Sequence, residues 1–255
     1  MTWDPERYLT FADERGRPFL DLVSRIDAAA PDRVVDLGCG PGNLTRTLAV
    51  RWPGAEVLGY DSSAEMIATA RRDPGQVTYD VLDLEGWLDS GDRADVVVSN
   101  AMLQWVPGHL ALLPRIVASV SPSGWLAFQV PGNFAEPSHT ILRALADEEP
   151  YAEATAGVAY PSVSDAKTYL RALQDLGCTV DAWETTYLHV LRGPDPVFTW
   201  ISGTGARPVL AALDGGLRAR FVEEYKSRLR AAYPDDGHGV VLPFRRVLVV
   251  AQVSG

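Results

Sequence analysis

Short apolar runs alternate with helix-spaced apolar positions along the first half of the chain. The runs occupy residues 33–37, 55–60, 76–82, 94–99 and 125–130. Because they are about six residues long and lack strict alternation, they are typical of strands covered on both faces. The helix-spaced segments between them occupy residues 44–52, 64–72 and 110–120. This alternation predicts a doubly wound, mostly parallel α/β sheet.

The second half of the chain has a different pattern. Helical spacing is found before the first strand (Phe19, Leu22, Val23 and Ile26) and over residues 138–148 and 164–176. Residues 179–191 and 240–253 indicate long strands, the second interrupted by Pro243. Between them Leu217, Phe221, Tyr225 and Leu229 repeat every four residues, so this long connection is predicted to be a helical cap.

The end of the first run and the loop that follows it read Asp36-Leu37-Gly38-Cys39-Gly40-Pro41-Gly42. Glycine at 38 permits a sharp turn, and glycine at 40 lets a ligand approach the backbone without meeting a Cβ. The spacing G-x-G-x-G differs from the G-x-G-x-x-G of nicotinamide dinucleotide sites, which argues against an oxidoreductase. Pro41 also removes a backbone donor that a pyrophosphate cradle would use. A plain strand-to-helix turn is the alternative for the loop taken alone.

Two carboxylates end the next two strands. Asp61 is placed to accept both hydrogens of a ribose diol, although it, Ser62 or Ser63 could instead cap the following helix. Asp83 is placed to accept from an exocyclic amine while Leu84 packs on a flat ring, with a helix cap as the alternative. Together with the glycine loop, the two carboxylates predict a nucleoside-containing cofactor beyond the carboxyl ends of the strands.

The glycine loop, Asp61, Asp83 and the segment from Asp95 to Trp105 resemble, in order, the motifs of the class I S-adenosylmethionine-dependent methyltransferases. The resemblance implies a Rossmann-like seven-stranded sheet with the last strand antiparallel, and S-adenosyl-L-methionine as the cofactor. It implies that Gly38 and Gly40 lie against the methionine portion of the cofactor.

The same resemblance assigns the remaining cofactor contacts. It implies that Asp61 holds the ribose, that Asp83 and Leu84 hold the adenine, and that Asn100 lies beside the methionine and the reacting methyl group. Three further residues complete the predicted cofactor set: Asp36, Ser62 and Arg17. Arg17 is assigned to the cofactor's own carboxylate, because related folds place an N-terminal helix over that end.

Four further motifs resemble the branch of this family that methylates trans-aconitate. They are Trp3-x-Pro5-x-x-Tyr8-Leu9-x-Phe11, Glu14-Arg15-x-Arg17-Pro18, Asn100-Ala101-x-Leu103-Gln104-Trp105 and Trp200-x-x-x-Thr204-Gly205-x-Arg207-Pro208. Because they extend from the start of the chain into the predicted cap, the resemblance covers nearly all of the sequence. It implies that the acceptor is a small tricarboxylate, esterified on one carboxylate.

This chemistry needs no dedicated base, because a carboxylate with a pKa of about 4 is already ionised at neutral pH. Proximity, alignment and exclusion of water then carry the reaction. We predict no certain catalytic residue and no metal, with Trp105 and His189 as positioning residues. The other histidines, His109, His139 and His238, are expected at the surface or at helix caps.

A tricarboxylate requires cations, and arginine matches carboxylate geometry. Arg207, in a glycine-rich bend of the cap, is the leading candidate, and Arg245 in the last strand is the second. Thr204 belongs to the same predicted acceptor site. Four aromatic residues, Trp3, Tyr8, Trp105 and Trp200, are expected to wall the pocket and face the sulfonium. For these aromatics the alternative is a place in the hydrophobic core.

Composition narrows the possible partners. The chain has 255 residues, with 23 Lys and Arg against 33 Asp and Glu, and a net charge of −10. This charge disfavours nucleic acids and anionic membranes as partners. Two cysteines form no disulfide framework, and no apolar stretch approaches the length of a membrane span. We therefore expect a cytoplasmic enzyme.

We expect one domain over residues 1–255. Its cofactor-binding half covers residues 30–132, a helical insertion covers 133–178, and the cap joins residues 192–238 with the N-terminal segment 1–29. Two functional alternatives remain open at this point. One is methylation of another small di- or tricarboxylate, and the other is a cofactor-binding regulator without catalysis.

Overall fold

The computed structural model describes residues 12–255, with side chains from residue 16 onwards. The chain divides into two compact units. Unit 1 comprises the described residues up to Val130 together with residues 163–185 and 246–255, and unit 2 comprises residues 131–162 and 186–245. The predicted insertion 133–178 is therefore divided between them, and the single-domain organisation stays a prediction.

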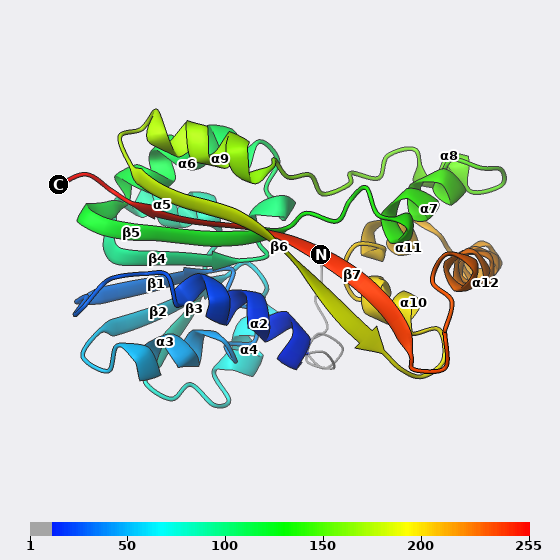
Figure 1. Cartoon of the computed structure of the whole chain (residues 1–255), viewed down its shortest axis with the longest axis horizontal. Helices are drawn as coiled ribbons and strands as arrows, with labels where there is room; N and C mark the ends of the chain where they lie inside the picture. The colour runs from blue at the N-terminus through cyan, green and yellow to red at the C-terminus, as the bar shows by residue number, and fades with distance from the viewer. Residues whose placement is uncertain (1–11) are drawn as a thin grey trace. The chain divides into compact units, whose positions relative to one another are not determined.

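A seven-stranded sheet runs through the molecule in the order β3-β2-β1-β4-β5-β7-β6 (Figure 1). Its strands are β1 (Arg33–Leu37), β2 (Glu56–Asp61), β3 (Val77–Val81), β4 (Ala94–Asn100), β5 (Val120–Pro131), β6 (Thr179–Leu191) and β7 (Val240–Gln252). The strand order reverses at β1, between β2 and β4. In a parallel sheet this reversal opens a crevice for ligands beyond the strand ends.

The first five strands of the order are parallel. Val35, for example, pairs with Leu58 of β2 and Val97 of β4. β7 runs antiparallel to β5, because the Val253 amide donates to the Gly124 carbonyl and the Gly132 amide donates to the Arg245 carbonyl. The mostly parallel sheet with an antiparallel last strand is confirmed.

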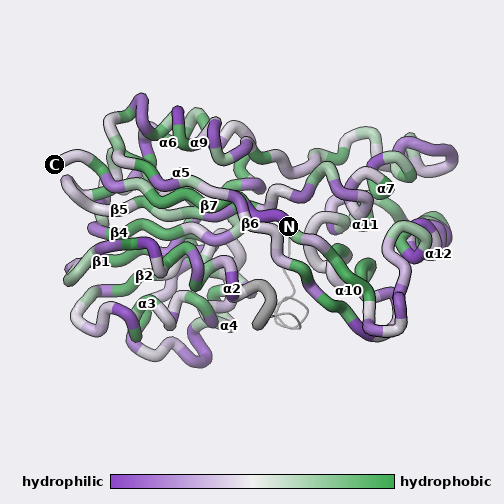
Figure 2. Tube along the Cα trace, in the orientation of Figure 1, coloured by the Kyte–Doolittle hydropathy of each residue, from purple (hydrophilic) through white to green (hydrophobic). Residues whose placement is uncertain are grey.

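Helices cover both faces of the sheet in unit 1. They are α2 (Ala12–Val23), α3 (Thr45–Arg51), α4 (Ala64–Ala70), α5 (Leu84–Ser90), α6 (His109–Ala118) and α9 (Ala166–Gln174). On one face, α2, α3 and α4 contribute to a hydrophobic cluster that includes Phe19 and Leu48. On the other face, α5, α6 and α9 contribute to a second cluster, which includes Trp87, Leu113 and Tyr169. Between them, hydrophobic residues follow β4 and β5 (Figure 2).

Unit 2 is built mainly from helices. These are α7 (Pro137–Ala146), α8 (Ala152–Thr155), α10 (Pro196–Ser202), α11 (Arg207–Ala212) and α12 (Gly215–Ala232). The apolar stripe predicted from four-residue spacing is confirmed, because Phe221, Tyr225 and Leu229 of α12 are buried. The Tyr225 hydroxyl donates to the Ser138 carbonyl at 2.5 Å, which ties α12 to α7.

The elements that differ from the sequence prediction include β7 and α5. β7 passes through Pro243 without interruption. Residues two apart on a strand direct their backbone groups to the same side, so the nitrogen of Pro243 faces the side on which Arg245 pairs with Gly132. β5 ends at Pro131, so that side needs no donor from Pro243. The second difference is α5, which was anticipated only through the alternative of a helix cap at Asp83.

Candidate functional site

The glycine loop turns sharply at the carboxyl end of β1. The amides of Gly38 and Cys39 both donate to the Tyr60 carbonyl, at 2.8 and 3.0 Å. Gly38 has a φ of +78°, and a Cβ there would lie 2.5 Å from the Met102 side chain. Gly40 has a φ of +56°, and no atom lies within 4 Å of the position its Cβ would take. The loop therefore leaves the backbone open to a ligand at Gly40.

Asp61 ends β2 beside this loop. Its Oδ2 accepts from the Gly40 amide at 2.9 Å, and its Oδ1 accepts from the Ser63 amide at 2.8 Å. Burial raises the pKa of Asp61, and these two amides lower it. The helix cap of α4 is Ser63, whose hydroxyl accepts from the Met66 amide, so Asp61 is not needed as a cap. Each carboxylate oxygen retains a lone pair for a ligand hydroxyl.

Asp83 ends the connection after β3 and caps α5. Its Oδ1 accepts from the Gly86 amide at 2.8 Å, so the capping alternative is correct. The cap does not exclude the ligand role, because a carboxylate has two oxygens and Asp83 also lines the cleft described next. Leu84, the first residue of α5, lines the same cleft although its side chain is largely buried.

A single cleft in unit 1 collects most of the predicted cofactor residues. Its lining includes Gly38, Gly40, Asp61, Ser62, Asp83, Leu84, Asn100 and Trp105, together with Leu37, Tyr60, Met66, Leu82, Ala101, Met102 and Val106. Sequence reasoning missed the second group. Tyr60 and Met102 each adjoin or closely follow a predicted residue at a strand end, so extending the strand-end rule by one or two positions would have found them.

Asp36 lies beneath the loop and is not among the described residues that line the cleft. It is 2% exposed, and its Oδ2 accepts from the Thr45 hydroxyl at 2.6 Å. Burial raises the pKa of Asp36 to about 7, the Thr45 hydrogen bond lowers it, and the charge of Asp61 raises it further. Asp36, near the end of β1, is therefore joined to the first turn of α3.

A buried tyrosine braces the loop from below. The Tyr79 hydroxyl, on β3, donates to the Gly42 carbonyl at 3.1 Å. A Cβ on Gly42 would lie 2.6 Å from the Tyr79 hydroxyl oxygen, and a Cβ on Gly59 would lie 2.6 Å from its ring. The ring thus occupies the space that side chains at both glycines would need. Burial raises the pKa of Tyr79 to about 12, so the hydroxyl stays protonated and able to donate.

Three predicted site residues, Trp3, Tyr8 and Arg17, come from the N-terminal part of the chain. Trp3 and Tyr8 lie outside the described residues. Arg17 lies on α2 with an exposed side chain, and it is not among the described residues that line the cleft. Its assignment to the cofactor's carboxylate stays a prediction.

The predicted acceptor residues that the structure describes all belong to unit 2. Trp200 is 2% exposed and stacks on His189, with 4.7 Å between the ring centroids. Phe244 packs against both rings, and Tyr187 stacks on the imidazole from β6. His189 therefore belongs to a buried aromatic cluster together with Trp200.

Both predicted arginines belong to unit 2, Arg207 directly after a glycine-rich bend and Arg245 on β7. Arg207 is half-buried and begins α11, where its amide donates to the Thr204 carbonyl at 3.1 Å. A Cβ on Gly205, within the bend, would lie 2.8 Å from His139 Nε2, so the bend packs closely on this imidazole. Arg245 on β7 donates through Nε to the Gly132 carbonyl at 2.8 Å.

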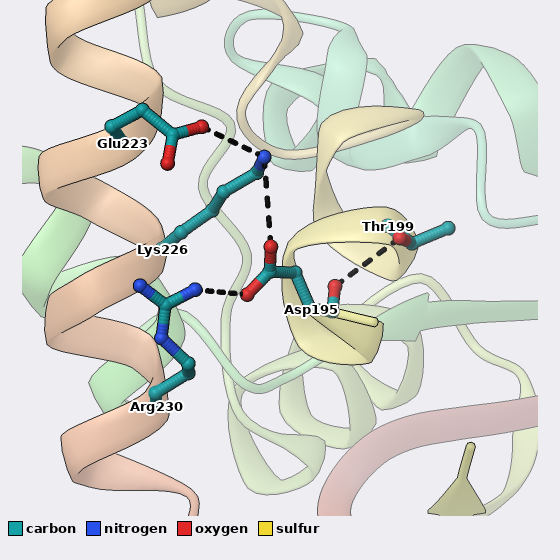
Figure 3. A network of polar contacts seen from close by, with 5 residues as sticks. All are labelled: Asp195, Thr199, Glu223, Lys226 and Arg230. Atoms are coloured by element: carbon teal, nitrogen blue, oxygen red, sulfur yellow. Dashed lines mark hydrogen bonds and ion pairs between the residues drawn. The ribbon is translucent and has the colours of Figure 1, made fainter. Parts of the chain in front are cut away.

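An ion-pair network fixes the start of α10, the helix that carries Trp200 (Figure 3). Asp195 has a φ of +46°, unusual for a residue with a Cβ, and its carboxylate pairs with Lys226 and Arg230 of α12. Its carbonyl accepts from the amide and the hydroxyl of Thr199, at 2.9 and 3.2 Å. The same residue therefore closes the first turn of α10 and joins this helix to α12.

The expectation for the histidines was wrong for His109 and His139, which are buried. His109 Nε2 lies 2.6 Å from the Tyr169 hydroxyl, and His139 packs edge-on against Phe134. Burial lowers the pKa of His139 to about 4, with a further contribution from the charge of Arg143. Both residues occupy positions that only the tertiary packing defines, and no periodic pattern in the sequence indicated them.

Comparison with known proteins identifies the family. Residues 10–182 match the methyltransferase-domain family. Among solved structures, a putative methyltransferase from Bacillus halodurans C-125 superimposes with a TM-score of 0.57 at 14% identity, covering 94% of this chain and all of that one. This likeness shows the fold. No helix among residues 12–255 has the length and hydrophobicity to cross a membrane.

Sequence relatives are much more similar. A trans-aconitate 2-methyltransferase from Mycolicibacterium gilvum is 51% identical over 256 residues, covering 99% of each chain. One from Streptomyces coelicolor is 49% identical over 263 residues, covering 98% of this chain and 86% of the relative. At this level of identity over nearly its full length, the chain belongs to the methyltransferase-domain family and, within it, to the group of trans-aconitate 2-methyltransferases.

Proposed function

We propose that this chain transfers a methyl group from S-adenosyl-L-methionine to a carboxylate of trans-aconitate, giving the monomethyl ester and S-adenosylhomocysteine. The observation that carries the proposal is the cleft in unit 1, where Asp61, Asp83 and Asn100 meet the glycine loop beyond the ends of parallel strands. The names of relatives that are about 50% identical support the choice of acceptor.

The cleft offers complementary groups to each part of the cofactor. When bound, S-adenosyl-L-methionine supplies an electrophilic methyl group carried by a sulfonium. Asp61 is held by two backbone amides, so its remaining lone pairs are preorganised to accept from the ribose hydroxyls. Asp83 accepts from the adenine amine, and the bare backbone at Gly40 admits the methionine portion.

Unit 2 supplies the acceptor site in this proposal. Arg207 and Arg245 are the cations that bind carboxylates, and Thr204 adds a hydroxyl group at the bend. Local cations are required because the whole chain carries a net charge of −10, which repels a trianion. The same overall charge favours a small molecule over a nucleic acid or an anionic membrane as the acceptor.

The proposed mechanism uses no general base. The acceptor carboxylate is already ionised at neutral pH, so no proton has to be removed from it. The chain contributes by aligning the carboxylate oxygen with the methyl group and by excluding water, which would otherwise solvate the nucleophile. Buried His139 fits this view, since its low pKa keeps the imidazole neutral and makes it a weak base near pH 7.

Label transfer tests the proposal directly. The purified chain is incubated with methyl-labelled S-adenosyl-L-methionine and trans-aconitate, beside a panel of a dozen other di- and tricarboxylates. We expect transfer to trans-aconitate with the highest kcat/KM, and mass spectrometry will locate the ester. A higher kcat/KM for another acid in the panel would replace the acceptor while keeping the reaction.

A calorimetric titration with S-adenosylhomocysteine separates catalysis from binding. Tight binding without transfer to any acid would indicate a cofactor-binding regulator and would contradict the proposed activity. Failure to bind S-adenosylhomocysteine would contradict the assignment of the cleft itself.

A further inference from the structure

Two buried side chains, Arg246 and Gln129, and the half-buried Asn100 form a chain of hydrogen bonds across adjacent strands of unit 1. Arg246 of β7 donates through Nη1 to Gln129 Oε1 of β5 at 3.3 Å, and Gln129 donates through Nε2 to Asn100 Oδ1 of β4 at 2.5 Å. Gln129 is 1% exposed and Arg246 is 5% exposed. Asn100 is the end of this chain that lines the cleft.

The charge of the arginine sets the direction of both hydrogen bonds. A guanidinium has only donors, so the atom of Gln129 that faces Arg246 must be its carbonyl oxygen. The amide nitrogen of Gln129 then faces Asn100, and the atom of Asn100 that receives it must be an oxygen. This assignment rests on donor and acceptor logic, which settles the amide orientations that atomic positions alone leave ambiguous. Asn100 is left with Nδ2, a donor, to offer to the cleft.

The backbone holds Asn100 in the same place. Asn100 pairs with Gln129 in the register of β4 and β5. The next residue, Ala101, has a φ of +55°, and its amide donates to the Gln129 carbonyl at 2.9 Å. Its carbonyl accepts from Gln104 Nε2 at 2.5 Å. Asn100 therefore has both its backbone position and its side-chain orientation fixed.

We propose that Arg246 and Gln129 are positioning residues that make Asn100 a hydrogen-bond donor for a carboxylate in the cleft. A donor complements an anionic oxygen and repels an ammonium group. The hydrogen bonds from Arg246 through Gln129 to Asn100 therefore favour carboxylates over amines as ligands of the cleft. The carboxylate belongs either to the cofactor's amino-acid end or to the acceptor. The second source rests on the proposed function, and the first does not.

Glutamate at position 129 inverts the arrangement with almost no change of shape. In Gln129→Glu the carboxylate still accepts from Arg246, but it has no hydrogen to donate to Asn100. Asn100 must then turn its nitrogen toward Glu and its oxygen toward the cleft, where it repels a carboxylate. We expect the affinity for the carboxylate ligand to fall about 30-fold or more, since a charge-assisted hydrogen bond is lost.

Methionine at position 129 is the matched control. Gln129→Met has a similar volume but removes the side-chain hydrogen bonds of Gln129 with both Arg246 and Asn100, so it should be the less stable protein in thermal unfolding. It does not force Asn100 to invert, so its affinity should fall only about 3- to 5-fold. The order of affinity is therefore opposite to the order of stability, which a merely structural role of Gln129 does not predict.

Two measurements identify the ligand. Calorimetry with S-adenosylhomocysteine reports on the cofactor's carboxylate, and KM reports on the acceptor's. The KM arm uses trans-aconitate, or the acid that the wild-type enzyme methylates best, so failure of the proposed acceptor does not remove the test.

Asn100→Asp is a further variant. It keeps the hydrogen bond from Gln129 but presents an acceptor to the cleft, so its affinities should match those of Gln129→Glu. Unchanged affinities in both arms, or a larger loss in Gln129→Met, would overturn the proposal.

Discussion

Asp36→Asn tests how burial controls the carboxylate beneath the glycine loop. Burial raises the pKa of Asp36 from 3.8 to about 7, although the Thr45 hydroxyl opposes this shift. Between these two values the folded protein holds a proton that the unfolded chain has released. The stabilisation by the protonated carboxyl is therefore complete below pH 3.8 and is lost as the pH rises through 7.

The magnitude follows from the two pKa values. Each pH unit within the window lowers the free energy of unfolding by about 1.4 kcal/mol, which gives about 4 kcal/mol over the whole window. Asparagine imitates the neutral carboxyl and still accepts from Thr45, but it does not titrate. The stability of Asp36→Asn relative to the wild type should therefore rise by about 4 kcal/mol from pH 4 to pH 7 and then level off.

Urea unfolding of both proteins at intervals from pH 4 to pH 8.5 measures this difference, and titrations common to both largely cancel. Thr45→Val is the second variant. It removes the hydrogen bond that lowers the pKa of Asp36, so the upper end of the window should move above pH 7. A stability difference that does not change with pH would refute the argument, because Asp36 would then titrate as it does in the unfolded chain.

The remaining predictions concern the cleft, the bend and the loop. Asp61→Asn should weaken S-adenosylhomocysteine binding about 10- to 100-fold in calorimetry, and an unchanged affinity would remove Asp61 from the ribose site. Arg207→Ala should raise the KM for trans-aconitate about 30-fold and leave the KM for the cofactor within twofold, whereas exposed Arg218→Ala changes neither. Equal effects of Arg207→Ala on both constants would argue against an acceptor role. Gly59→Ala should lower the free energy of unfolding in urea by about 2 kcal/mol, and by much less in a Tyr79→Val background; additive effects would exclude their steric conflict.

Much of the fold could be predicted because its signals are local. The strand at 33–37 was predicted with its observed bounds, since the buried run Val34 to Leu37 follows Asp32 and Arg33 and ends at the glycine loop. β5 was expected to begin at Trp125 but begins at Val120. The intervening Ser-Pro-Ser-Gly sequence is typical of a turn, and Ser123 has a positive φ; pairing with β4 extends the strand through this irregularity.

The site could be predicted as far as strand ends define it. Asp61, Asp83 and Asn100 were found because parallel strands bring their carboxyl ends to one edge. Gln129 and Arg246 were not assigned roles, since they act through neighbours in the sheet. Their importance depends on strand order, which places β7 beside β5, and no spacing along the chain encodes that adjacency.

The ring of Tyr79 also limits the routes by which this protein can evolve. A methyl group at position 59 collides with the aromatic ring, and a shortened side chain at position 79 leaves an empty space under the loop. Each single change is therefore costly, although a methyl group at position 59 fills part of the space that a shortened side chain at position 79 leaves. Descendants of this chain are expected to exchange both positions in quick succession, with the shortening of the tyrosine first, or to keep both unchanged.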